Sequence, residues 1–175
     1  MRLFFALTFD TPQKQTISQY RDVVADNAIK GNFSREVNFH ITLAFIGHCH
    51  HAQLPALSEA LFSLKQTPNH ITVEHFGSFK RKGSEMVWLS VVKEPELLAL
   101  HKQLFTLLTR SGFELEKRKY TPHITVGRNV VMQNPLSELM ISPFDMSIRS
   151  IALMESKTVG GLLVYEALEE IFLRP

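Results

Sequence analysis

The chain has 175 residues, of which 45% are hydrophobic and 21% are charged, and its formal net charge is +2. This length and hydrophobic content are typical of a folded domain, so a disordered chain is excluded, and no apolar run is long enough to cross a bilayer. The positive charge is small, so any contact with nucleic acid has to come from local basic patches.

The first half of the chain alternates apolar strands with amphipathic helices. Residues 2–9 predict a strand rather than a signal peptide, because the apolar stretch is short and lacks a small-residue cleavage site. A helix is expected from Thr11-Pro12, with apolar residues at helical spacing until Gly31 ends it. The elements expected next are a strand over 38–45, a helix over 54–64 and a strand over 71–79.

The second half repeats this plan. We expect a strand over 86–92, a helix from Pro95 to Gly112, strands over 120–128 and 146–154, and a final strand or strand pair over 162–173. The stretch from Arg2 to His40 spans 38 positions, and that from Met86 to His123 spans 37. These offsets predict an approximate internal repeat, residues 2–79 and 86–156, within a single domain of residues 1–175. The predicted architecture is α+β and bilobal: each lobe is an antiparallel sheet with helices on its outer face, and a cleft lies between the lobes.

One strand in each half carries the same short pattern. The two copies are His40-Ile41-Thr42-Leu43 and His123-Ile124-Thr125-Val126. Side chains alternate along a strand, so each histidine shares a face with its threonine, while the aliphatic residues point to the core. One copy would be weak, and a satisfied structural histidine is the alternative for each. Two copies in apolar strands at matching offsets favour a shared polar site.

The paired His-x-Thr-x patterns resemble the signatures of the two-histidine (2H) phosphoesterases. They are most similar to the branch of bacterial RNA 2′,3′-cyclic phosphodiesterases, also known as 2′-5′ RNA ligases of the LigT/ThpR type. The resemblance extends to the opening Arg2-Leu3-Phe4-Phe5-Ala6, to Phe45-Ile46-Gly47 after the first motif, and to Pro122 and Arg128 around the second. It implies two motif strands facing each other across a cleft. It also implies metal-free hydrolysis of RNA 2′,3′-cyclic phosphates to 2′-phosphates, and reversible 2′-5′ joining of tRNA halves.

The two histidines suit the opening of a cyclic phosphodiester. One proton has to leave the attacking water and another has to reach the departing 3′ oxygen, and histidine does either near neutral pH. Our hypothesis makes His123 the proton acceptor and His40 the proton donor, although the symmetry of the motifs does not fix the roles. Thr42 and Thr125 are predicted to bind the non-bridging phosphate oxygens, with ordinary strand propensity as the alternative.

Two further residues are candidates for substrate binding. Arg128 lies five positions after His123 and would point away from it in a regular strand, but Gly127 permits a bulge that turns it toward the cleft. A solvated strand-end arginine is the alternative. Tyr120 is predicted to stack on a nucleobase, with core packing as the alternative.

The clusters Lys80-Arg81-Lys82 and Lys117-Arg118-Lys119 are either solvated turns or a basic fringe of the cleft. No cofactor and no metal site are expected, because the ligands in His48-Cys49-His50-His51 are contiguous and do not converge on one ion. The single cysteine fits a cytoplasmic protein. The expected partner is RNA with 2′,3′-cyclic phosphate ends, including tRNA halves, bound by a monomer without a membrane. A non-catalytic RNA-end-binding module and a phosphodiesterase for a small cyclic nucleotide are the alternatives.

Overall fold

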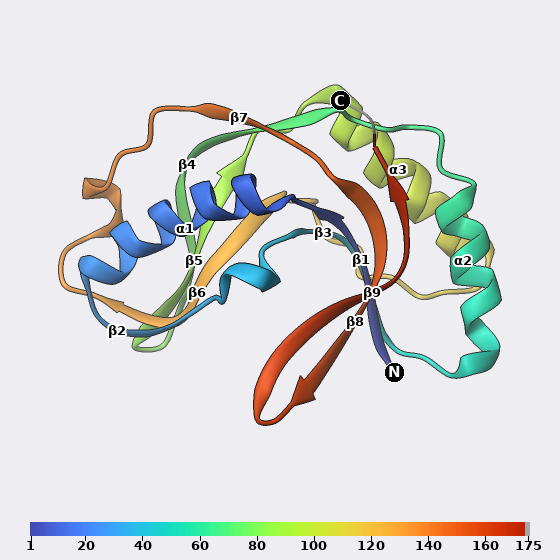
Figure 1. The fold of residues 1–175 in the computed structure, drawn as a ribbon, viewed down its shortest axis with the longest axis horizontal. Helices are drawn as coiled ribbons and strands as arrows, with labels where there is room; N and C mark the ends of the chain where they lie inside the picture. Colours follow the sequence, from blue (N-terminus) through green and yellow to red (C-terminus); the bar gives the residue numbers. More distant parts are fainter. Residues whose placement is uncertain (174–175) are drawn as a thin grey trace.

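The computed structural model describes residues 1–173, which form two antiparallel β-sheets flanked by helices (Figure 1). The two sheets are named A and B. The strands of sheet A lie in the order β3 (Ile41–His48), β1 (Arg2–Thr8), β8 (Ser150–Val159) and β9 (Leu162–Phe172). The strands of sheet B lie in the order β2 (Ala28–Phe33), β6 (His123–Met132), β5 (Ser84–Val91), β4 (His70–Arg81) and β7 (Phe144–Ser147). The predicted α+β class with two lobes is confirmed.

Three α-helices cover the sheets, and each has a proline in its first turn, where a missing N–H costs no hydrogen bond. Each helix buries one apolar stripe, as the spacing predicts. The helices are α1 (Thr11–Asp26), α2 (Leu54–Phe62) and α3 (Pro95–Arg110), and short 3₁₀ turns lie at Glu36–Asn38, His51–Gln53 and Leu136–Glu138. Within residues 1–173, no helix has both the length and the apolarity needed to cross a bilayer.

The helices connect the two lobes. Helix α1 follows β1 of sheet A but packs against β2 and β6 of sheet B. Helix α3 follows β5 of sheet B but packs against β3 of sheet A, where α2 lies beside it. Figure 1 shows α1 on one side of the molecule and α2 with α3 on the other. Because of this exchange, buried residues of both sheets and all three helices form one continuous hydrophobic core.

Strand β1 explains why residues 2–9 are apolar without interruption. It lies between two neighbours inside sheet A, so both of its faces are covered. Leu3, Phe5 and Leu7 pack into the continuous core, whereas Phe4 and Ala6 pack into a second small cluster on the opposite face. A strand buried on both faces is a continuous hydrophobic run rather than an alternating one.

The predicted end of the first helix is wrong. Helix α1 ends at Asp26, and Gly31 is not a helix cap but a residue of strand β2, which pairs with β6. A side chain at Gly31 would contact Phe33 and Val130 at 3.0 Å, so the glycine permits close packing of the sheet. The helical spacing predicts too long a helix because the apolar Ala28 continues the pattern of α1, although Ala28 is the first residue of a strand.

The single strand predicted over 146–154 is also wrong. This stretch is divided between β7, at the edge of sheet B, and β8, in the middle of sheet A. The crossing occurs at Ile148 and Arg149 without a glycine or a proline, so the local sequence contains no turn signal. Each sheet therefore takes strands from both halves of the chain. The internal repeat of residues 2–79 and 86–156 stays a prediction.

Candidate active site

The two predicted histidines lie at one cavity. His40 immediately precedes β3, and His123 is the first residue of β6. Both line a cavity of about 700 Å³ together with Thr42, Thr125 and Arg128, in the size range of small-molecule sites. Tyr120 lines the same cavity, so the fold brings together all six residues that the sequence singled out.

The same backbone contact orients both imidazole rings. The Nδ1 of His40 lies 2.8 Å from the carbonyl oxygen of Asn38, and the Nδ1 of His123 lies 2.6 Å from that of Thr121. A carbonyl oxygen only accepts hydrogen bonds, so Nδ1 carries the proton in each ring. The Nε2 atom of each neutral ring is therefore left with a lone pair, which is the form a proton acceptor needs.

Both rings are held in the neutral state. Burial lowers the pKa of His40 to about 4. The Asn38 carbonyl opposes this shift, and the positive charges of Arg128, of Lys14 and of His123 when it is protonated add to it. Burial also lowers the pKa of His123, with a further contribution from Arg128 and an opposing one from the Thr121 carbonyl. An anion placed between these groups would remove part of the charge repulsion and raise both pKa values.

Aromatic rings supply that burial, and the sequence did not point to them. Phe4 and Tyr165 lie against His40, with ring centroids 5.1 and 4.9 Å away. Trp88 and Phe79 lie against His123 at 5.2 and 5.9 Å. Phe4 and Trp88 stand in strongly apolar strands and resemble ordinary core residues. Phe79 lies in the mixed strand β4, and Tyr165 comes from β9, where no motif marks it. Each histidine thus lies beside two rings that exclude water.

The threonines lie on the faces that the alternation predicts. Ile41, Leu43, Ile124 and Val126 are buried in the core, and the histidine and threonine of each motif line the cavity instead. The Oγ1 of Thr42 lies 3.0 Å from Nε2 of His40, where the hydroxyl donates to the unprotonated nitrogen. Thr125 lines the cavity from β6 and occupies the corresponding place in the second motif.

A β-bulge lies at the last residue of each motif and changes which side chains reach the cavity. In β3, the pairing with β1 skips Leu43 and then continues to Phe45, which lies opposite Phe4. In β6, the pairing with β5 skips Val126 and continues at Gly127. A bulge adds one residue, so the residue five positions after each histidine returns to the histidine face.

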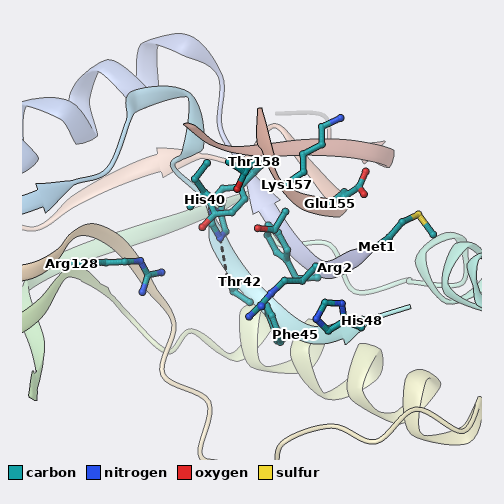
Figure 2. Close-up of a pocket in the computed structure, with 14 residues that line it drawn as sticks. Met1, Arg2, His40, Thr42, Phe45, His48, Arg128, Glu155, Lys157 and Thr158 are labelled. Carbon is teal, nitrogen blue, oxygen red and sulfur yellow. Dashed lines mark hydrogen bonds between the residues drawn. The ribbon is translucent and has the colours of Figure 1, made fainter. Parts of the chain in front are cut away.

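Arg128 occupies this place in the second motif. It lines the cavity beside His40, and its side chain extends toward His40 and Thr42 (Figure 2). Its guanidinium Nη1 lies 3.1 Å from the sulfur of Met86. A side chain at Gly127 would approach Val130 to 2.8 Å, so the packing beside the bulge leaves little room for any residue but glycine.

Tyr120 joins the two lobes. Its hydroxyl donates to the backbone carbonyl of Thr42 at 2.9 Å. This hydrogen bond connects the segment before β6, which leads into sheet B, to strand β3 of sheet A. Its ring is stacked on His101 of α3, with centroids 3.9 Å apart and an angle of 9°. Burial raises the pKa of the phenol, so it stays a donor. His101 covers one face of the ring, which leaves less of Tyr120 for a nucleobase than the sequence suggested.

Basic side chains from both predicted clusters line the cavity. Lys80 and Arg81 come from the end of β4, and Arg118 and Lys119 come from the segment before β6. Arg118 is paired with Glu116, so part of this charge is compensated. The arrangement matches a basic fringe rather than two unrelated turns.

The His48–His51 stretch does not converge on one point. Cys49 is buried and exchanges backbone contacts with Met1, whereas His50 and His51 are exposed. Within residues 1–173, no group of three or more histidine, cysteine, aspartate or glutamate side chains is arranged to hold a metal ion.

Two curated proteins have sequences similar to that of this chain. An RNA 2′,3′-cyclic phosphodiesterase of Thermotoga maritima is 33% identical over 131 residues, which cover 73% of this chain and 70% of the relative. A protein of the same name from Archaeoglobus fulgidus is 31% identical over 137 residues, which cover 77% of this chain and 76% of the relative.

Solved structures share the fold along the whole chain. The crystal structure of Escherichia coli LigT complexed with 3′-AMP is similar with a TM-score of 0.76 and 25% identity, and the match covers 99% of this chain and 98% of that one. The crystal structure of TT0787 of Thermus thermophilus is similar with a TM-score of 0.78, 20% identity and the same coverage. Residues 9–160 match the family model described as the 2′-5′ RNA ligase superfamily. The chain therefore belongs to this superfamily.

Proposed function

We propose that the protein hydrolyses RNA 2′,3′-cyclic phosphate ends to 2′-phosphates, with His40 and His123 as its acid–base pair. One observation carries the proposal: two imidazoles, each oriented through Nδ1, share a cavity with two threonines and an arginine. The relatives named RNA 2′,3′-cyclic phosphodiesterase support RNA as the substrate class. The LigT complex with 3′-AMP supports a nucleotide as the ligand of this fold.

The reaction is a displacement at phosphorus. The oxygen of a water molecule forms a bond to phosphorus while the bond from phosphorus to the 3′ oxygen breaks. Nε2 of His123 takes the proton from the water, and Nε2 of His40 gives a proton to the 3′ oxygen. The phosphate stays on the 2′ oxygen. His123 ends protonated and His40 ends neutral, and His123 then loses a proton to solvent while His40 regains one when the next substrate binds.

Because the pKa of His40 is low, the bound substrate has to help to protonate this residue. His40 is neutral near pH 7 in the ligand-free protein, whereas the proton donor has to be charged when the reaction begins. The phosphodiester anion bound between the rings raises the pKa of His40 and stabilises its protonated form. Substrate binding near neutral pH should therefore be accompanied by uptake of a proton.

Thr42, Thr125 and Arg128 are assigned to the phosphate. The threonine hydroxyls donate to the two non-bridging oxygens, and the guanidinium of Arg128 balances the charge that develops on them. Donors fixed in place before the reaction lower its barrier, because they need no reorganisation in the transition state.

An assay in excess chelator tests this function. The substrate is a short oligonucleotide that ends in a 2′,3′-cyclic phosphate, with the H40A/H123A double variant as the control. We expect turnover to the 2′-phosphate that the chelator does not reduce, and a bell-shaped dependence of rate on pH. Binding without turnover would overturn the proposal in favour of a non-catalytic RNA-end-binding module. Turnover restricted to mononucleotides would instead show a phosphodiesterase for small cyclic nucleotides.

Further parts of the proposal concern the cellular role. A ribose 5′-hydroxyl in place of water would give a 2′-5′ linkage by the same displacement, so tRNA halves are candidate substrates for joining. Incubation of a cyclic-phosphate oligonucleotide with a 5′-hydroxyl oligonucleotide tests this directly. We also propose that the protein acts as a cytoplasmic monomer, which is consistent with its single, buried cysteine.

A further inference from the structure

The ring of Tyr165 reaches His40 from the opposite edge of sheet A. His40 immediately precedes β3, at one edge of the sheet, and Tyr165 belongs to β9, at the other edge. Strands β1 and β8 lie between these two edges, which corresponds to roughly 14 Å between the outer strands. Even so, the centroids of the two rings are only 4.9 Å apart. The pairing of neighbouring strands therefore does not join these two residues directly.

Asn38 connects them through its side chain. It is the last residue of the 3₁₀ turn that precedes β3, and it lies two positions before His40. Its Nδ2 donates to the carbonyl oxygen of Leu163 at 2.9 Å, and its Oδ1 accepts from the backbone N–H of Tyr165 at 3.3 Å. Strand β9 is an edge strand, and one amide group here bonds both a C=O and an N–H of it. The side chain therefore takes the place of a neighbouring strand at this edge.

The backbone of Asn38 acts on the same imidazole. Its carbonyl accepts a hydrogen bond from Nδ1 of His40 at 2.8 Å. Its side chain holds the strand from which Tyr165 stands against that ring at an angle of 85°. One residue thus contacts both the nitrogen that carries the proton and the strand whose ring excludes water.

Strand β9 has little other support at this place. The pairing of β1 with β8 ends at Ser156, and Tyr165 is the residue of β9 opposite Ser156. Beyond this pair, β8 and β9 have only each other as pairing partners among residues 1–173, and Figure 1 shows this end of the hairpin projecting from the molecule. Arg35 adds a longer contact, 3.4 Å, to the carbonyl of Leu163. An isolated two-stranded hairpin is only marginally stable, so the bonds from Asn38 stabilise β9 where the sheet ends.

The second lobe places its covering rings in a different way. Thr121 has the position that corresponds to Asn38, and its carbonyl accepts from Nδ1 of His123. The rings against His123 are Trp88 of β5 and Phe79 of β4, and these strands follow β6 directly in the order of sheet B. Strand pairing alone brings those rings to the histidine. The first lobe lacks this arrangement, because β9 does not pair with β3.

We propose that Asn38 is a positioning residue of the active site, whose side-chain amide holds Tyr165 of β9 against His40. Without the amide, the Tyr165 segment would move away from the imidazole and water would reach the ring. His40 would then be less well fixed for the transfer of its proton to the 3′ oxygen. This inference rests on the proposed function, in which His40 is the proton donor.

The pKa of His40 reports this role directly. Charged and titratable groups face His40 from several elements: Lys14 of α1, Arg35 before the 3₁₀ turn, His123 and Arg128 of β6, Arg149 before β8, and Glu170 of β9. The variant N38A changes none of these charges and keeps the backbone carbonyl. Burial is the largest influence on the pKa of His40 and lowers it, so loss of the cover has to raise it.

The experiment combines this pKa with steady-state kinetics. N38A should raise the pKa of His40 from about 4 to about 5, measured by NMR titration of the ligand-free protein. It should lower kcat for a cyclic-phosphate oligonucleotide about tenfold and leave KM within about twofold. Y165A should have the same effects, and Y165F, which keeps the ring, should restore the low pKa. The double variant N38A/Y165A should resemble Y165A, because both changes remove the same cover.

The matched control is N27A. The Asn27 side chain also donates to a backbone carbonyl, that of Val23 at 2.8 Å, but it lies at the end of α1 and does not line the cavity of the two histidines. N27A should lower the stability of the protein and leave both kcat and the pKa of His40 unchanged. N38S also lacks the amide and replaces N38A if that variant does not fold.

The other outcomes overturn the inference or the proposed function separately. A wild-type pKa and kcat in the folded Asn38 variant, equal effects in N27A, or additive losses in the double variant would show that Asn38 does not act through Tyr165. A rise in KM at constant kcat would place Asn38 in substrate binding instead. If the wild-type protein does not hydrolyse the substrate, the proposed function fails, and the pKa values of His40 in the ligand-free proteins still decide the role of Asn38.

Discussion

The two motif strands use the same backbone to present different chemistry. In both, a carbonyl two residues earlier fixes the histidine, a threonine follows on the same face, and a bulge returns the fifth residue to that face. The fifth residue is aromatic in one lobe and cationic in the other. A symmetric scaffold could bind a phosphodiester in either of two directions. The difference between Phe45 and Arg128 makes the two halves of the cleft chemically unequal.

The largest expected effect comes from removing either histidine. H40A and H123A should each lower turnover by about 10²–10⁴, because each ring moves one proton in the same step. Circular dichroism and thermal unfolding should show a folded protein in both cases. The control is H75A, which removes an exposed histidine of β4. Near-normal activity in both variants would disprove the assignment of His40 and His123 as the acid–base pair.

The threonines test whether the two halves share the phosphate equally. T42V and T125V keep the shape of the side chain and remove its hydroxyl, and each should lower kcat by about 10²–10³. T109V, at the exposed end of α3, is the control. A decrease in kcat in only one of the two variants would mean that only that threonine contacts the charge that develops on the phosphate.

The acid side of the stability profile tests the burial of His40. The folded-state pKa of about 4 lies below the ordinary value of 6.5, so the unfolded chain binds the proton first. The contribution of His40 to the free energy of unfolding is complete above pH 6.5. This contribution, roughly 3 kcal/mol, is lost as the pH falls toward 4. Urea unfolding at several pH values should show a shallower acid loss in H40Q than in the wild type. Parallel profiles would contradict this account of His40.

The smallest effect is expected at Tyr120, which holds the lobes together rather than contacting the phosphate. Y120F removes the hydrogen bond to Thr42 and should lower the free energy of unfolding by about 1 kcal/mol. It should also lower kcat a few-fold with little change in KM, because the position of Thr42 changes and substrate affinity does not. Y20F, in a ring stacked on Phe144, is the control. A rise in KM at constant kcat would place Tyr120 in substrate binding instead.

The sequence predicts what depends on neighbouring residues. The alternation within His40–Leu43 and His123–Val126 identifies the polar face and the core face, and the apolar stripes of the helices locate α2 and α3. It does not predict what depends on distant parts of the chain. The approach of Tyr165 to His40 requires β9 to pair with β8, and the split of 146–154 depends on which sheet receives each part. Gly127 was the one local signal of a bulge, and no such residue announces the bulge before Phe45.

The exchange of helices between the sheets has a consequence for motion. Because α1 and α3 each leave one sheet and insert into the core beside the other, the lobes have no linker about which to swing. Opening the cleft like a hinge would disturb apolar side chains that the two lobes share, and this shared packing opposes the motion. The separation of the two imidazoles is therefore set by this shared packing and not by a flexible linker. We expect changes in the size of the accepted substrate to come first from individual side chains that line the cavity.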